Sequence, residues 1–152
     1  MAEIVAQHRA GVVLMHRRGN PQTMHLYTDY GNVMQDVIRE LEESVRLAVG
    51  LGIARDQMAV DPGLGFSKTP AQNIELMRTL ERLAVLELPV VLGPSRKSFL
   101  GQLTKRDVHE REFATAACVA AAVFKGCHIL RVHNVRMMKD VVDVAFEIGK
   151  AG

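Results

Sequence analysis

Short apolar runs alternate with longer helical patterns along this chain. The runs lie at residues 12–15, 58–60, 90–92 and 129–132, and three of them are rich in valine or isoleucine. Runs of this length and composition are typical of strands that are buried in a sheet. The pattern therefore predicts four strands.

Helical spacing fills the stretches between the runs. Between residues 32 and 49, apolar side chains recur every three or four positions, as on a helix that packs one face against a core. Thr69 and Pro70 combine a capping box with proline at the first helical position, and Asn134 is a good N-cap. We expect helices over residues 32–49, 69–83, 108–125 and 134–148, after a helix tail at residues 1–10.

The order of these elements is a strand followed by a helix, four times. Such alternation predicts an α/β fold with parallel strands and right-handed crossovers. Two architectures fit, an open doubly wound sheet and part of an eight-stranded barrel. No linker or low-complexity stretch divides the chain, so we expect one domain over residues 1–152.

Composition narrows the class of protein. The chain has 152 residues, of which 48% are hydrophobic and 24% charged, as in ordinary globular proteins. A net charge of +2 is too small to indicate general nucleic-acid binding. The N-terminus does not resemble a signal peptide, and no apolar run reaches the ~20 residues that span a membrane. Cys118 and Cys127 have no metal-ligand spacing, so we expect buried thiols in a reducing cytoplasm.

Unusual polar residues follow each expected strand. The segments are residues 16–21, 61–68 and 93–99, with Arg131 and His133 at the fourth strand. The segments at the opposite ends, such as residues 50–53 and 87–89, carry no such residues. Parallel α/β folds place their sites where strands end. This contrast favours part of an enzyme over a purely structural domain.

The charges at this edge indicate a class of ligand. Lys97, Arg131 and His133 are expected to converge with one acid, Asp61. A basic cluster that faces helix N-termini favours phosphate or pyrophosphate. A lone carboxylate suits a ligand with two parallel N–H donors, such as an aminopyrimidinone ring, and Phe66 is placed to pack near a planar ring.

Each of these interpretations has a structural alternative. Asp61 begins an Asp-Pro-Gly turn, and its carboxylate is as well suited to cap this turn as to bind a ligand. Residues 95–97 have the charge pattern of a solvated loop. Arg131 lies within an expected apolar strand, where a buried guanidinium would need a partner, and this favours a functional role. The histidines show no metal-ligand spacing, and the methionines are expected in the core.

The polar segments, taken together and in this order, resemble dihydropteroate synthase. The matching stretches are residues 14–24, 61–68, 93–99 and 131–135. The third and fourth are specific, whereas the second is shared more loosely with other pterin-binding barrels. Asn134 stands where the family often has aspartate.

The resemblance implies roles for individual residues. Asp61 would bind the aminopyrimidinone edge of the pterin, and Lys97 its carbonyl oxygen and ring nitrogen. Arg131 would stack on the ring and help to hold pyrophosphate, with His133 on the leaving group. The implied catalytic residues are Lys97, Arg131 and His133, and the implied substrate-binding residues are Met15, Asp61, Phe66, Gly93, Ser95, Lys97 and Arg131.

The resemblance also implies what lies elsewhere. The family forms a (β/α)8 barrel, and this chain matches strands five to eight, a partial barrel. The first four strands bring the asparagine that binds Mg²⁺, so no metal ligand is expected in this chain. Met1 falls inside a family element, as in a fragment, a truncated gene model or a natural half-barrel. We expect the isolated chain to be inactive.

The implied reaction joins 6-hydroxymethyl-7,8-dihydropterin pyrophosphate to para-aminobenzoate and releases pyrophosphate. A pterin-binding module or relic half-barrel without catalysis is the alternative. A methyltransferase-type pterin domain is disfavoured by residues 95–99 and 131–133. Family members are dimers through their last helices, so a homodimer is possible.

Overall fold

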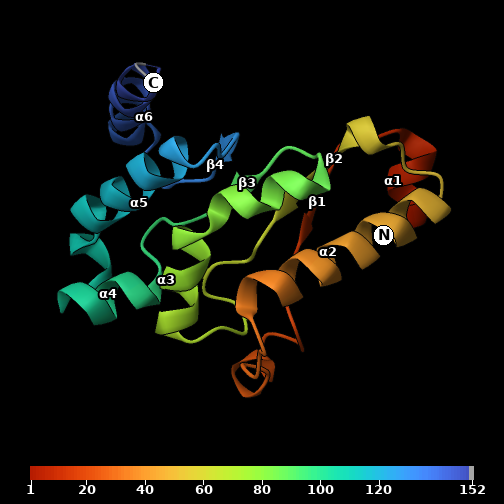
Figure 1. Ribbon diagram of the computed structural model, residues 1–152, viewed down its shortest axis with the longest axis horizontal. Coiled ribbons are helices and arrows are strands. Elements are labelled where there is room, and N and C mark those ends of the chain that lie inside the picture. The colour runs from red at the N-terminus through yellow and green to blue at the C-terminus, as the bar shows by residue number, and fades with distance from the viewer. Residues whose placement is uncertain (151–152) are drawn as a thin grey trace.

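Four parallel strands form the centre of the computed structural model, and each is followed by a helix (Figure 1). The strands are β1 (Val12–Met15), β2 (Met58–Asp61), β3 (Val91–Leu92) and β4 (Ile129–Leu130). The structure describes residues 1–150, so residues 151 and 152 of the expected domain lie outside the described part.

The strands pair in the order in which they occur along the chain. β1 pairs with β2 from Val12–Met58 to Met15–Asp61, and β3 pairs with β4. A parallel bridge between Val60 and Val90 joins the two pairs. The predicted α/β fold with parallel strands is confirmed.

The α-helices lie at the predicted places in outline, except that α4 was not predicted. They are α1 (Ala2–His8), α2 (Val33–Gly50), α3 (Pro70–Arg78), α4 (Ser98–Thr104), α5 (Glu112–Phe124) and α6 (Val135–Gly149). Short 3-10 helices cover Met24–Leu26, Arg55–Gln57, Leu80–Leu86 and Val108–Glu110. Neighbouring helices pack against one another from α2 through α3 and α5 to α6, and in Figure 1 they form a row from right to upper left.

Side-chain caps begin the helices where the sequence indicated. The Asn32 carboxamide oxygen accepts the N–H of Gln35, and Asn134 accepts that of Met137. Thr69 and Gln72 form the reciprocal bonds of a capping box. Each cap satisfies a backbone donor that has no partner within its helix.

Three element boundaries differ from the sequence-based expectation. The second expected helix ends at Arg78, where the Thr79 hydroxyl donates to the Glu75 carbonyl. It continues as a 3-10 helix, and its buried Leu80, Leu83 and Leu86 recur every three residues, which is the 3-10 period. The expected helix from residue 108 begins at Glu112, and the last strand ends at Leu130.

The core lies between the strands and the helix row. Val37, Val60, Leu76, Leu83 and Leu92 are fully buried within one cluster. The opposite side of β1 is open: Val13 and Met15 are 50% and 40% exposed. Among residues 1–150, no helix is both long enough and apolar enough to cross a membrane.

Candidate functional site

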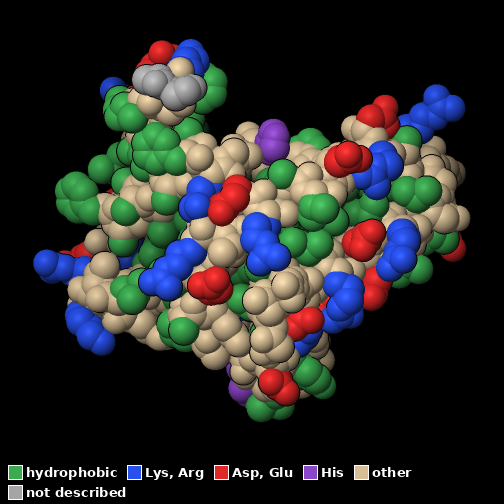
Figure 2. Space-filling model, in the orientation of Figure 1, with side chains coloured by type: hydrophobic (Ala, Val, Ile, Leu, Met, Phe, Trp, Pro, Cys, Tyr) green, Lys and Arg blue, Asp and Glu red, His purple; other side chains and the backbone are tan. Residues whose placement is uncertain are grey.

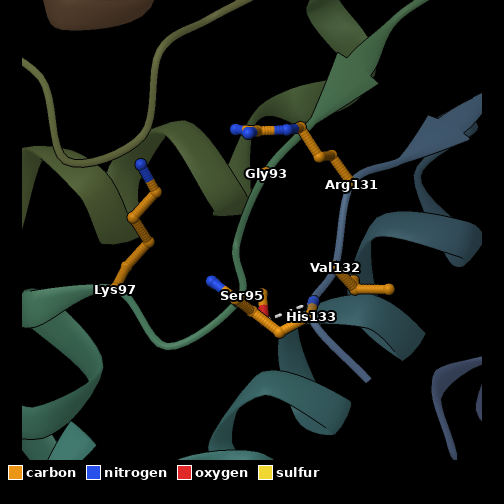
Figure 3. A pocket seen from close by; sticks show the side chains of 6 residues that line it. All are labelled: Gly93, Ser95, Lys97, Arg131, Val132 and His133. Atoms are coloured by element: carbon orange, nitrogen blue, oxygen red, sulfur yellow. Dashed lines mark hydrogen bonds between the residues drawn. The ribbon is translucent and has the colours of Figure 1, made fainter. Parts of the chain in front are cut away.

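A hollow of about 320 Å³ opens where β3 and β4 end (Figure 3). Its lining comes from two loops, the one after β3 and the one after β4. The lining residues are Gly93, Ser95, Lys97, Arg131, Val132 and His133. All but Val132 were singled out from the sequence, and the structure brings them together.

Ser95 joins the two loops. Its hydroxyl accepts the backbone N–H of His133 at 3.2 Å and lies 2.8 Å from His133 Nδ1. The hydroxyl donates to Nδ1 when the ring proton is on Nε2, and accepts from Nδ1 when the proton is there. In either case Ser95 holds the His133 ring in place.

Lys97 extends toward the same space, over the end of the β2 loop. Its Nζ lies 4.3 Å from the centre of the Phe66 ring, a cation–π contact. Burial lowers the pKa of Lys97, and nearby Arg131 adds to this effect, while Asp61 opposes it. Gly65 leaves room for the Lys97 stem, because a Cβ there would lie 3.2 Å from Lys97 Cδ.

Asp61 is the acid of this cluster and also caps its own turn. Its Oδ1 accepts the Gly63 N–H at 2.7 Å, so the structural alternative is present in the fold. Burial raises the pKa of Asp61, against the Gly63 hydrogen bond and the charges of Lys97, Lys68 and Arg131. The carboxyl group therefore caps the turn and also interacts with the cations of the site.

The expectation of a buried Arg131 was wrong. Arg131 is exposed and follows β4, where its backbone N–H donates to the Leu92 carbonyl. Among the described strands β4 pairs with β3 alone, so it is an edge strand. The Arg131 side chain extends into the hollow that Lys97 also faces, as Figure 3 shows.

The loop that carries Lys97 is held by the start of α5. Arg96 has a left-handed backbone (φ 56°), and its N–H donates to buried Thr115 Oγ1. Its guanidinium pairs with Glu112 at 2.6 Å. Arg111 donates to the Arg96 carbonyl at 3.1 Å. The solvated-loop alternative for residues 95–97 is therefore wrong, because three side chains of the 111–115 segment fix this loop.

Three candidate residues lie outside the hollow lining: Asp61, described above, Met15 and Phe66. Met15 ends β1 directly beside Asp61 of β2 and is partly exposed. Phe66 reaches the site through its contact with Lys97. The candidate residues thus span the ends of all four strands, and only those after β3 and β4 enclose a hollow.

Comparison with known proteins identifies the family. Residues 1–133 match the family described as "Pterin binding enzyme". The chain belongs to this family. The match covers all four strand ends and therefore the whole candidate site.

Relatives within the pterin-binding family are dihydropteroate synthases. The chain is 44% identical to the dihydropteroate synthase of Synechocystis over 93% of its own length and 50% of that protein. It is 38% identical to that of Bacillus subtilis over 91% of its length and 46% of that protein. The chain spans about half the length of these curated relatives.

Solved structures show the same correspondence. The Yersinia pestis dihydropteroate synthase with a sulfonamide drug superimposes with a TM-score of 0.96 at 33% identity. That match covers 99% of this chain and 55% of the other. A Thermus thermophilus dihydropteroate synthase in complex with 4-aminobenzoate gives 0.92 at 33% identity, covering 97% and 60%.

One polar cluster of this family member was missed from the sequence. Lys68, His16, Glu40 and Arg18 form a connected network beneath the ends of β1 and β2. Sequence reasoning placed His16 and Lys68 in the polar segments but gave them no role. The available signal was their position, since both segments begin where a strand ends. Glu40 lies on α2 and carries no comparable signal.

The residues at this site do not fit Mg²⁺. The hollow is lined by two cationic side chains and a histidine. Mg²⁺ prefers carboxylate and water oxygens in octahedral geometry. Within residues 1–150, no group of three His, Cys, Asp or Glu side chains gathers as a metal site. We therefore derive no chemical step through the metal from these residues.

Proposed function

We propose that this chain forms the half of a dihydropteroate synthase site that strands five to eight of a (β/α)8 barrel supply. The reaction would join 6-hydroxymethyl-7,8-dihydropterin pyrophosphate to para-aminobenzoate, as part of folate synthesis. The products would be 7,8-dihydropteroate and pyrophosphate. A single pterin-binding domain over residues 1–152 would carry this half-site.

One observation carries the proposal. Side chains from the ends of β2, β3 and β4 converge as one carboxylate, Asp61, facing the cations Lys97 and Arg131, with His133 beside them. A pterin pyrophosphate has matching features, an aminopyrimidinone edge that donates two N–H groups and a pyrophosphate anion. A site for a simple phosphate would not need the partly buried carboxylate.

The proposed roles follow from this arrangement. Asp61 would accept from the pterin edge, and Lys97 would donate to its carbonyl oxygen and ring nitrogen. Arg131 would stack on the ring and contact pyrophosphate with His133. Met15 and Phe66 would line the ring pocket, Gly93 would allow close approach, and Ser95 would face the aminobenzoate.

Charge explains how these groups would promote the reaction. The bond between the pterin methylene and the pyrophosphate oxygen breaks, and the oxygen keeps the electron pair. Arg131 and His133 would stabilise that negative charge. The aniline nitrogen then bonds to the cationic methylene and releases a proton. Preorganised donors of this kind often make the largest contribution to catalysis. Mg²⁺ would be held by residues outside this chain and supply further charge neutralisation.

The open side of the strands supports the partial barrel. Val13 and Met15 on β1 and Ile129 on β4 are 40–50% exposed, at the two outer strands of the row. Apolar strand faces are normally covered. A second group of four βα units would cover them and add the rest of the site.

A homodimer through the last helices is part of this proposal. α5 and α6 share an apolar hollow of about 440 Å³ that is lined by Ala120, Phe124, Asp140, Val141, Val144, Ala145 and Ile148. Figure 2 shows hydrophobic side chains gathered over this end of the molecule.

We also propose a cytoplasmic location for this protein. Cys118 and Cys127 are free thiols, as is usual in that reducing compartment.

The alternative is a pterin-binding module without catalysis. Such a module would need only the pterin contacts of this half-site. Calorimetry with the pterin pyrophosphate and a pyrophosphate-release assay separate the two functions. Synthase function requires turnover when a separately expressed chain supplies strands one to four, whereas a module binds the pterin in that mixture without turnover. Absence of pterin binding in the mixture would contradict both.

A further inference from the structure

We propose that Lys68 is a positioning residue for the candidate site, which fixes the 61–68 loop to β1 and places a positive charge beside the turn that holds Asp61. This inference rests on the proposed function only in taking Asp61 as the pterin-binding acid. Lys68 does not line the hollow at the ends of β3 and β4 and would not touch a ligand there.

The hydrogen bonds of Lys68 define the anchoring. Its Nζ is 3.2 Å from the Gly63 carbonyl, 2.9 Å from the Phe66 carbonyl and 2.9 Å from His16 Nδ1. Three acceptors match the three N–H donors of an ammonium group. The first two belong to the loop, and the third belongs to the residue that follows β1. Lys68 thereby ties the loop to the neighbouring strand.

Close packing shows that this attachment is specific. Gly63 has φ 71°, and a Cβ there would lie 2.0 Å from the His16 carbonyl oxygen. The loop backbone therefore rests directly on His16. The Gly63 N–H donates to Asp61 while its carbonyl accepts from Lys68, so one residue links the buried cation to the acid.

The contact between His16 Nε2 and Glu40 determines the tautomer of His16. His16 is 4% exposed, and its Nε2 lies 3.0 Å from Glu40 Oε2. Glu40 also accepts from Arg18 at 3.1 Å. Nε2 therefore donates to a carboxylate that Arg18 keeps ionised, and Nδ1 is left to accept from Lys68.

Protonation states agree with this network. Burial, with Lys68 nearby, lowers the pKa of His16 to about 4. Burial lowers the pKa of Lys68 to about 7, against the attraction of Asp61 and Glu40. Between these values Lys68 is mainly cationic and His16 neutral, as the hydrogen bonds require. Arg18 and Lys97 also face Lys68 and oppose its charge.

The same cation acts on Asp61. Burial raises the pKa of Asp61, and Lys97, Lys68 and Arg131 oppose that rise. Lys97 and Arg131 face the hollow, where a bound anion would offset their charge. Lys68 lies on the protein side, so its contribution persists when a ligand binds. Asp61 also acts on Cys127, which stays neutral because burial raises its pKa to about 11.

The test is the pKa of Asp61, measured by carboxyl ¹³C NMR in the 152-residue chain. Loss of a nearby positive charge raises the pKa of a carboxyl group by about 1 pH unit. Lys68→Met should show this rise, and Lys68→Arg, which keeps the charge, should not. Lys139→Met, which removes an exposed lysine on α6, is the matched control. A purely structural role predicts the same Asp61 pKa in all these variants, and that result would overturn the inference.

A second measurement needs no substitution, in case Lys68→Met does not fold. The ¹⁵N shifts of His16 at pH 6 in the unmodified chain should show neutral imidazole with the proton on Nε2. A proton on Nδ1 would mean that Lys68 donates no bond there, which contradicts the anchoring.

A ligand titration distinguishes failure of this inference from failure of the proposed function. The probe is 6-hydroxymethylpterin, followed by its fluorescence from pH 4 to 7. Binding should weaken at a higher pH in Lys68→Met than in the unmodified chain. If the unmodified chain binds no pterin but the Asp61 pKa still shifts on substitution, the pterin assignment fails and the role of Lys68 stands.

Discussion

At the scale of single residues, the candidate site depends on charges held at close range in a partly buried space. The sequence located most of them, because each follows a strand and parallel strands end at one edge. It missed the network around Lys68, since Glu40 comes from a helix far along the chain. It also misjudged Arg131, since the exposure of a strand depends on which neighbours it has. Pairing over long range is not encoded in a local pattern.

Asp61→Asn should weaken pterin binding by about 1.5–3 kcal/mol, the usual range for loss of a hydrogen bond to a charged group. The amide keeps the size of the side chain and can still accept from Gly63, but it replaces one acceptor oxygen with a donor. Calorimetric titration of the pterin, with strands one to four supplied by a second chain, measures the change. Equal affinity of variant and unmodified chain would exclude the proposed pterin contact.

Arg131→Lys should lose most of the turnover of the complemented enzyme. Lysine keeps the charge, but it cannot stack on a ring or bind an anion in bidentate geometry. The pyrophosphate-release rate measures this loss, and Arg136→Lys, an exposed position at the start of α6, serves as control. Near-normal turnover of Arg131→Lys would refute the stacking role.

His16 should make the fold less stable in mild acid. Its folded pKa of about 4 lies below the ordinary value of 6.5, so only the unfolded chain binds the proton between these values. The contribution of His16 to the free energy of unfolding is therefore fully present above pH 6.5. It falls as the pH decreases toward 4, by about 2 kcal/mol at pH 5. Denaturant unfolding at pH 7 and pH 5 should show a smaller fall for His16→Gln. Equal falls in the two proteins would disprove this linkage.

At the scale of elements, local signals predicted the strands and caps, and the core modified the rest. Thr69, Asn32 and Asn134 cap helices as their sequence contexts indicate. After Arg78, α3 gives way to a 3-10 helix whose buried leucines recur every three residues. A search for apolar stripes does not distinguish this spacing from that of an α-helix. α4 was overlooked because it is only seven residues long.

A side chain at Gly101 of α4 should displace Arg111. A Cβ there would lie 2.3 Å from the Arg111 guanidinium, which would have to leave the backbone of the Lys97 loop. Gly101→Ala should destabilise the fold by about 1–3 kcal/mol, as overpacking does. Gly50→Ala is the matched control, because that position on α2 has open space. Denaturant unfolding measures both, and equal stability of the two variants would mean that Arg111 can move without cost.

At the scale of the whole molecule, the chain has a continuous core on one side of its strands and open apolar positions on the other. The relatives are about twice as long, and we propose that their additional strands cover the open side. The sequence-based inference of four βα units is consistent with the family match and the structural superpositions. The charged groups of the site are as unevenly placed: the one acid and the cations come from the ends of β2, β3 and β4.

The 152-residue chain alone should show no dihydropteroate synthase activity, and mixing with strands one to four should restore it. Catalysis requires pterin, pyrophosphate and amine in one geometry, and a displacement of about 1 Å can reduce the rate by about 10²-fold. An open site also contains water, whose high dielectric constant weakens the interactions between charges within it. Pyrophosphate release with both substrates and Mg²⁺ is measured for each half and for the mixture, with Asp61→Asn as control. Turnover by the lone chain near that of an intact enzyme would show that four strand ends suffice, and the half-site interpretation would be wrong.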